Sequence, residues 1–135
     1  MQRPIALAHA LADETRWRIA SLVAGEALCV CELADILDLP QSTLSSHLQV
    51  MRSGGLVTAE RCEKWAYYRL ASEVLPVWKA MKALGDSEPG SNRTLTNDRK
   101  KAAARLALRG QSECKGPRRS IPPRLQPRRQ SSLVR

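Results

Sequence analysis

A short turn between two helix-like stretches, Asp38-Leu39-Pro40, constrains the fold of this chain more than any other feature. Apolar residues recur at 3–4-residue spacing before it, in residues 30–37, and again after it, in residues 42–53. Pro40 ends the first helix and permits a second, for which Ser42 is the expected cap and Gly54-Gly55 the end. The residues expected to be buried are Leu33, Ile36 and Leu37 on the first helix and Leu44, Leu48 and Met51 on the second.

Two further helices are predicted ahead of this pair. Residues 4–12 form one amphipathic stretch and residues 14–23 form another. Asp13 is a good N-cap for the second of these helices, and Gly25 stands where a C′ glycine is expected. The N-terminal third of the chain is therefore expected to be helical.

The periodicity changes after the glycine pair. Residues 56–62 and 65–70 are two β-compatible runs around Glu63-Lys64, which predicts a hairpin. A fifth helix follows, with Ser72 as its cap and Pro76 in its first turn. The expected fold is mainly α with a small β-hairpin, in the order α-α-α-α-β-β-α. This is a winged helix-turn-helix, which places its second helix in the major groove of DNA.

The charge of the chain divides it into two parts. The formal net charge is +9, but basic and acidic residues balance within residues 1–85, so the excess lies in residues 86–135. We expect residues 1–85 to form the DNA-binding and dimerisation domain and residues 86–135 to form a basic, largely disordered tail. Residues 98–109 could form a helix, but nothing obvious packs on it. The tail could add nonspecific affinity for phosphates.

The compartment expected for this chain indicates what its cysteines do. No apolar run is long enough to cross a bilayer, and the first residues do not read as a signal peptide, so we expect a cytoplasmic protein with no membrane partner. In that reducing compartment, cysteines bind metal or sense redox more often than they form disulfides. The four cysteines are Cys29, Cys31, Cys62 and Cys114.

Cys29-Val30-Cys31 stands at the start of the first helix of the helix-turn-helix. Thiolates favour soft ions, and a helix N-terminus lowers the pKa of a thiol. Residues i and i+2 do not face each other on a helix, whereas they lie on one side of an extended backbone. Both sulfurs can therefore reach one ion only if residues 29–31 are not regular helix. We expect binding to distort or unwind the first helical turn and so to misplace the second helix.

Five motifs in this chain share their order and spacing with one family. They are Leu11-Ala12-Asp13-Glu14-Thr15-Arg16, Leu28-Cys29-Val30-Cys31-Glu32-Leu33, Ser42-Thr43-Leu44-Ser45-Ser46-His47-Leu48, Arg52-Ser53-Gly54-Gly55-Leu56-Val57 and Lys64-Trp65-Ala66-Tyr67-Tyr68-Arg69-Leu70. Residues 11–70 closely resemble the ArsR/SmtB family of metal-responsive repressors, and with flanking helices the resemblance covers roughly residues 4–85. It implies a homodimeric repressor that releases operator DNA when an inducer binds. A twofold dimer predicts an imperfect palindromic operator.

The Cys-Val-Cys element resembles that of the arsenite- and antimonite-responsive branch, and the cadmium/lead branch shares it. No cysteine precedes Cys29, and the fifth helix lacks the His residues of zinc and nickel sites, so arsenite or antimonite is the expected inducer, with no organic cofactor. Trivalent arsenic prefers three ligands, but relatives often have a third Cys where this chain has Ala34. The third ligand could be Cys62, Cys114, a cellular thiol or a hydroxide. Alternatively, the inducer could be a monomethylated arsenical that needs only two sulfurs.

The other site residues follow from the expected helix faces and from the resemblance. The candidate DNA contacts on the second helix of the pair are Gln41, Ser42, Thr43, Ser45, Ser46, His47 and Gln49, with Arg61 and Lys64 in the wing. The candidate dimer contacts are Leu7, Leu11, Val74, Val77, Trp78 and Met81. Relatives usually have Gly near Glu63, and an acidic residue there weakens the approach of phosphate.

Two alternatives to arsenic sensing keep the same fold. One is a thiol-based redox or persulfide sensor, and the other is a cadmium/lead-responsive repressor. An enzyme is not expected, because the sequence has no paired carboxylates, no nucleophile–base set and no phosphate-binding loop.

Overall fold

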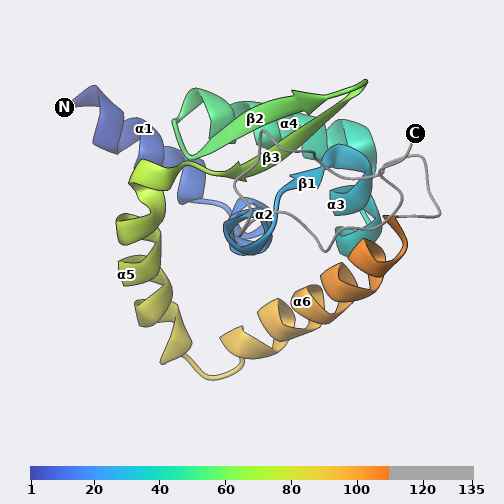
Figure 1. The fold of residues 1–135 in the computed structure, drawn as a ribbon. Coiled ribbons are helices and arrows are strands. Elements are labelled where there is room, and N and C mark those ends of the chain that lie inside the picture. Colours follow the sequence, from blue (N-terminus) through green and yellow to red (C-terminus); the bar gives the residue numbers. More distant parts are fainter. Residues whose placement is uncertain (110–135) are drawn as a thin grey trace.

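The computed structural model describes residues 1–109 as six α-helices and a three-stranded sheet (Figure 1). The elements are α1 (Gln2–Leu11), α2 (Glu14–Gly25), β1 (Leu28–Cys29), α3 (Val30–Leu37), α4 (Gln41–Ser53), β2 (Val57–Cys62), β3 (Trp65–Leu70), the 3₁₀ turn η1 (Ser72–Val74), α5 (Leu75–Asp86) and α6 (Ser91–Ala107). The expected winged helix-turn-helix is present, with α3 and α4 as the helix pair and β2–β3 as the wing.

The helix ends agree only in part with the expected caps. Asp13 caps α2 as predicted, because its carboxylate accepts a hydrogen bond from the Arg16 backbone N–H at 3.0 Å. Ser42 is not a cap: α4 begins at Gln41 after Pro40, and the first turn needs no side-chain acceptor. Ser72 is not a cap either, because it lies inside the turn η1.

Gly25 is also placed differently from the prediction. It is the last residue of α2 and has no positive φ, so the C-cap is the extended residue Glu26. Pro76 lies in the first turn of α5, as predicted. Gly54 has a steric role, because a Cβ there would come within 2.9 Å of the Ala6 carbonyl oxygen. Helix α1 therefore lies against the end of α4 with almost no space between their backbones.

The sheet has the strand order β1-β3-β2, with both pairs antiparallel. Strand β1 is only two residues long and pairs Cys29 with Tyr67. The hairpin closes through the pair Cys62 and Trp65, with Glu63 in the left-handed region at φ 62°. The sheet therefore joins the wing directly to the segment that carries Cys29.

The core is aliphatic, as a chain without Phe requires. Side chains from α2, α3 and α4 meet in it, and Ile19, Leu33, Leu44 and Met51 are completely buried. The main aromatic contribution is the pair Trp17 and Trp78, whose ring centroids lie 4.6 Å apart. This cluster fixes the reading helix α4 against the rest of the domain.

Helix α6 is the main difference from the expected architecture. Figure 1 shows that α5 runs away from the sheet and that α6 returns to α3. Leu95, Ala102 and Leu106 pack against the core, and the Asp98 carboxylate accepts two hydrogen bonds of 2.9 Å from Arg18 on α2. The expectation that nothing packs on a helix in residues 98–109 is therefore wrong. The expected disorder beyond Gly110 lies outside the described residues.

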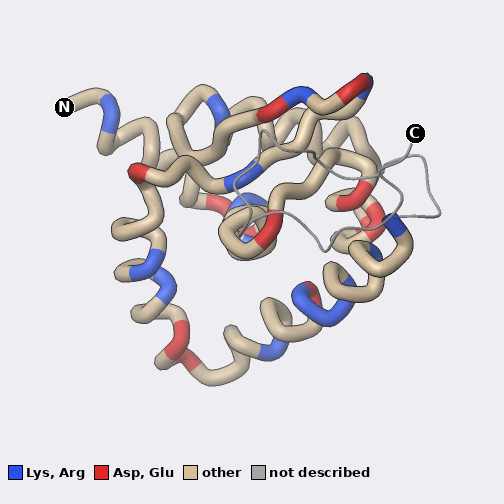
Figure 2. The backbone as a smooth tube through the Cα atoms, in the orientation of Figure 1, with Lys and Arg blue, Asp and Glu red and all other residues tan. Residues whose placement is uncertain are grey.

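The outward face of α6 is basic (Figure 2). Its exposed charged residues Arg93, Arg99, Lys100 and Lys101 are all positive, and its one acidic residue, Asp98, is buried. Within residues 1–109, no helix combines the length and the apolar character that spanning a membrane requires.

Candidate thiol site and DNA-reading face

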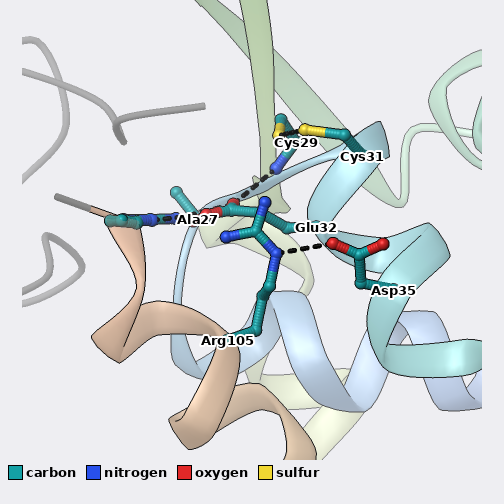
Figure 3. Close-up of polar contacts among 7 residues, drawn as sticks. Ala27, Cys29, Cys31, Glu32, Asp35 and Arg105 are labelled. Atoms are coloured by element: carbon teal, nitrogen blue, oxygen red, sulfur yellow. Dashed lines mark hydrogen bonds and ion pairs between the residues drawn. The ribbon is translucent and has the colours of Figure 1, made fainter. Parts of the chain in front are cut away.

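Cys29 and Cys31 converge at the junction of β1 and α3 (Figure 3). Their Sγ atoms are 2.8 Å apart. Cys29 has extended backbone angles, φ −94° and ψ 171°, and is the N-cap of α3, whereas Cys31 lies within the first helical turn. Of the three residues, Cys29 alone lies outside the regular helix, and its extended backbone is enough to bring the two sulfurs together. The expected unwinding is not needed, because the two sulfurs already meet beside an intact helix.

The spacing of the sulfurs suits a chelated ion after a small adjustment. Metal–sulfur bonds of about 2.3 Å hold two sulfurs about 3.4–3.8 Å apart at ordinary bond angles. From 2.8 Å, the two Sγ atoms must separate by less than about 1 Å to reach that value. Cys29 is 1% exposed and Cys31 is half-buried, so the open side of the site is the Cys31 side.

The environment of Cys31 does not favour the thiolate in the way expected of a helix N-terminus. Burial raises the pKa of the Cys31 thiol, and the neighbouring carboxylates of Glu32 and Asp35 raise it further. The Arg105 guanidinium acts in the opposite direction. The backbone N–H of Glu32 at the helix N-terminus lowers the pKa of Cys31 as expected, but burial outweighs it and the net pKa shift is upward.

A buried carboxylate lies directly behind the two cysteines (Figure 3). Glu32 is 0% exposed, and its Oε1 accepts a hydrogen bond from the Cys29 backbone N–H at 3.1 Å. Arg109, which is also 0% exposed, donates to both Glu32 oxygens, at 2.5 and 2.8 Å, and to the Ala27 carbonyl oxygen at 2.7 Å. Arg105 donates to Asp35 at 2.7 Å. Arg105 of α6 and Arg109, two residues beyond the end of α6, thus bind the two acidic residues of α3.

Sequence reasoning missed these groups. Glu32 follows the N-cap Cys29 by three residues, which is the spacing of a capping box, and this signal was available. Arg105 and Arg109 are one helical turn apart, but nothing local shows that their partners lie about 70 residues earlier in the chain.

Of the two candidate third ligands in this chain, Cys62 is the one that lies among the described residues. Cys62 belongs to the same small cluster as Cys29 and Tyr67, in which Trp65 also packs. However, the register places Cys62 on β2 and Cys29 on β1, two strand spacings or about 10 Å apart across β3. Within residues 1–109, no three Cys, His, Asp or Glu side chains are grouped to hold a metal ion. Ala34 lies on α3, and Cys114 lies outside the described residues.

The predicted reading face of α4 is open to solvent. Its exposed residues are Gln41, Ser42, Thr43, Ser45, Ser46 and Gln49. His47 is half-buried instead: its Nδ1 lies 3.3 Å from Arg16 Nη1 and 3.9 Å from the Asp13 carboxylate. His47 therefore connects the reading helix to the start of α2.

The wing presents both of its predicted cations. Arg61 and Lys64 are exposed at the end of the hairpin, where Figure 2 also shows acidic charge. The Lys64 ammonium lies 5.0 Å from the centroid of the Trp65 ring, and Arg61 Nη1 donates to the Lys64 carbonyl oxygen at 3.5 Å. Glu63 lies between the two strands at the tip.

The candidate dimer residues fall into two groups. Leu11, Val74 and Trp78 are buried within the protomer, and Leu7 is partly buried against its core. Val77 and Met81 are 43% and 38% exposed. Two large apolar residues that were not predicted, Ile5 on α1 and Leu84 on α5, are also exposed. Exposed apolar side chains therefore remain on both α1 and α5.

Comparison with known proteins agrees with this geometry. Residues 13–59 match the model of "Bacterial regulatory protein, arsR family". The chain is 48% identical over 69 residues to the arsenic resistance transcriptional regulator ArsR1 of Pseudomonas putida, covering 50% of this chain and 53% of that protein. It is 44% identical over 79 residues to the arsenical resistance operon repressor of Escherichia coli, covering 57% and 66%. The chain thus spans about half to two-thirds of the length of these curated relatives.

Solved structures give the same result at the level of the fold. The homodimeric winged helix-turn-helix domain of a possible ArsR-family regulator from Mycobacterium bovis is 31% identical, with a TM-score of 0.60, and the match covers 63% of this chain and 80% of that one. HlyU from Vibrio cholerae is 32% identical with a TM-score of 0.57, covering 62% and 91%. The α3–α4 pair, the wing and the matched sequence together place this chain in the arsR family of bacterial regulatory proteins.

Proposed function

We propose that this protein is a transcriptional repressor that leaves its operator when trivalent arsenic or antimony binds Cys29 and Cys31. The observation that carries the proposal is the 2.8 Å contact between the two Sγ atoms at the N-cap of α3. It sets two soft ligands on the first helix of the DNA-reading unit, and soft ligands select thiophilic ions. Relatives named for arsenic resistance support the choice of inducer.

The DNA-binding state uses the face of α4 and a second copy of the chain. Hydroxyl and amide side chains on α4 can contact base edges and phosphates, while Arg61 and Lys64 contact the flanking backbone. The exposed apolar side chains of Val77, Met81 and Ile5 provide a surface for a homodimer. In a twofold dimer the two reading helices face an imperfect palindrome, with half-sites one helical turn or about 34 Å apart.

Release follows from the place of the thiol pair. A chelated ion forces the two sulfurs apart, and this displaces the cap of α3. Leu33 and Leu44 connect α3 to α4 through the fully buried core, which transmits a shift of α3 rather than absorbing it. The reading helices then no longer match the spacing of the two half-sites.

Coordination of the ion can be completed in more than one way. The two sulfurs suffice for a monomethylated arsenical, and a hydroxide or a cellular thiol can enter from the Cys31 side, which is the more exposed one. Cys62 becomes a third ligand only if Trp65 moves aside, because β3 separates the two strands that carry the cysteines.

The test is a release titration with the full-length protein under reducing conditions. The DNA is a duplex selected by the protein from a random library, and the arms are arsenite, antimonite, methylarsenite, cadmium and polysulfide. We expect arsenite or antimonite to release the DNA and Cys29→Ser/Cys31→Ser to stay bound at every concentration. A third variant, Cys62→Ser, removes the remaining described cysteine and tests whether the wing supplies a ligand.

Each arm separates one alternative from the proposal. Release of the double variant by arsenite shows that another site senses the ion. Release by polysulfide alone, with a mass increase on Cys29 or Cys31, shows a persulfide sensor, and release by cadmium alone shows the cadmium/lead type. Loss of the arsenite response in Cys62→Ser shows that the wing cysteine completes the site.

A further inference from the structure

Glu32 connects the start of α3 to Arg109, which lies 77 residues later in the chain. Its Oε1 accepts from the Cys29 backbone N–H, which fixes the start of α3, and from Arg109 Nη2 at the end of the described chain. Arg109 Nη2 also donates to the Ala27 carbonyl oxygen, just before β1. The segment that presents the thiols is therefore held on both sides by one buried ion pair.

Arg109 has little freedom to adopt another position. Its side chain is completely buried, it donates to both Glu32 oxygens through Nε and Nη2, and its guanidinium lies 5.6 Å from the centroid of the Tyr67 ring. A guanidinium that binds a carboxylate through two parallel hydrogen bonds fixes the orientation of the carboxylate as well as its charge. Tyr67 is also the residue paired with Cys29 in the sheet.

We propose that Arg109 is a positioning residue of the thiol site: acting through Glu32, it holds the backbone of Cys29 where the two sulfurs converge. The inference rests on the function proposed above and adds a role for α6, which carries the arginine to the site. Figure 3 shows the same arrangement for Arg105, which extends from α6 toward Asp35 beside the cysteines.

The effect of losing Arg109 follows from burial. Without the arginine, the Glu32 carboxylate is left in the interior with no counter-charge, which is strongly unfavourable, so it turns outward or draws in water. The Cys29 N–H then loses its acceptor. Part of the free energy of ion binding is then used to bring the two sulfurs together. The affinity for the ion falls, because a preorganised pair of ligands binds more tightly than a mobile one.

The test compares Arg109→Gln with Arg18→Gln in the full-length, reduced protein. Arg18→Gln also breaks an ion pair of α6, the one with Asp98, but does so on α2 rather than behind the cysteines. Arsenite affinity is measured without DNA by calorimetry, and amide hydrogen exchange is followed for residues 29–33. We expect Arg109→Gln to weaken arsenite binding about tenfold, the value of one hydrogen bond to a charged group. Its Cys29 amide should exchange faster, and Arg18→Gln should stay within about twofold of wild type.

A second variant keeps the test decisive if Arg109→Gln does not fold. Arg109→Lys keeps the buried charge but loses the two-point pairing with Glu32, so its arsenite affinity should fall between the wild-type value and that of Arg109→Gln. Equal losses in Arg109→Gln and Arg18→Gln would mean that α6 acts only by docking, and an unchanged affinity in Arg109→Gln and Arg109→Lys would refute the positioning role.

The proposed function and the positioning role of Arg109 are tested by different measurements. If the wild-type protein does not bind arsenite, arsenic sensing is wrong. The exchange rate of the Cys29 amide in Arg109→Gln and Arg109→Lys still decides whether Arg109 positions the thiol segment.

Discussion

At the scale of single residues, two glutamates occupy energetically unfavourable positions, one because of its backbone conformation and one because its carboxylate is buried. Glu63 takes a left-handed backbone conformation at the tip of the wing, at the first position of a two-residue hairpin turn, where glycine is favoured. Glu32 is an acid buried behind Cys29 and Cys31. The first cost is local, and the second is offset by an arginine from another helix.

Replacing the wing-tip glutamate should stabilise the fold. Glu63→Gly removes a left-handed β-carbon, which costs about 1 kcal/mol, so the free energy of unfolding in urea should rise by about that amount. Glu63→Gln removes the charge but keeps the left-handed β-carbon, so it should not show this gain in the free energy of unfolding. Both variants should bind DNA more tightly than wild type at low salt, because each removes a negative charge near phosphate. Equal stability of the two variants would rule out the backbone explanation.

At the scale of elements, the predictions succeeded where local chemistry decides the structure. The apolar spacing of Leu44, Leu48 and Met51 and the carboxylate of Asp13 were sufficient to place α4 and the start of α2. Strand β1 was missed because two residues carry no period. Helix α6 was missed because its docking depends on ion pairs with partners up to 80 residues away, such as Asp98 with Arg18. A sequence pattern does not identify such partners.

The cap of α2 gives a prediction with a defined pH dependence. Asp13→Ala should lower the free energy of unfolding by about 1 kcal/mol at pH 7, and Asp13→Asn should lose much less. The hydrogen bond from the Arg16 N–H is the main cause that holds the pKa of Asp13 below its ordinary value. The carboxylate therefore stabilises the fold above that ordinary value and ceases to do so as the pH falls.

Urea unfolding at pH 7 and near pH 3 checks this sign. The difference between wild type and Asp13→Ala should shrink at the lower pH, because the wild-type carboxylate becomes protonated there. A difference that stays the same at both pH values would mean that Asp13 does not act through its charge.

At the scale of the whole molecule, exposed apolar side chains lie on α1 and α5, and Lys and Arg are concentrated along α6 (Figure 2). The thiol site lies between the wing and α6, on β1 and α3. Three residues of the predicted dimer set, Leu11, Val74 and Trp78, belong to the buried core of the protomer. The residues left for a partner are those that the core does not cover.

Charging the exposed apolar residues of α5 should therefore separate the subunits. Val77→Glu/Met81→Glu places two carboxylates on the exposed face of α5, where a partner would have to bury them. Sedimentation should show a monomer, and affinity for a palindromic duplex should fall at least tenfold. Lys79→Glu/Lys82→Glu is the matched control, because it adds two carboxylates elsewhere on the same helix. A dimer that survives the first change would place the interface elsewhere.

The ion pair between Glu32 and Arg109 also affects the order in which the protein is completed during synthesis. Its two residues are 77 positions apart, so a ribosome makes the whole reading unit before it makes the arginine. Domains generally fold as units. The candidate site at Cys29 and Cys31 therefore cannot reach its final form until Arg109, near the end of the described chain, has been made.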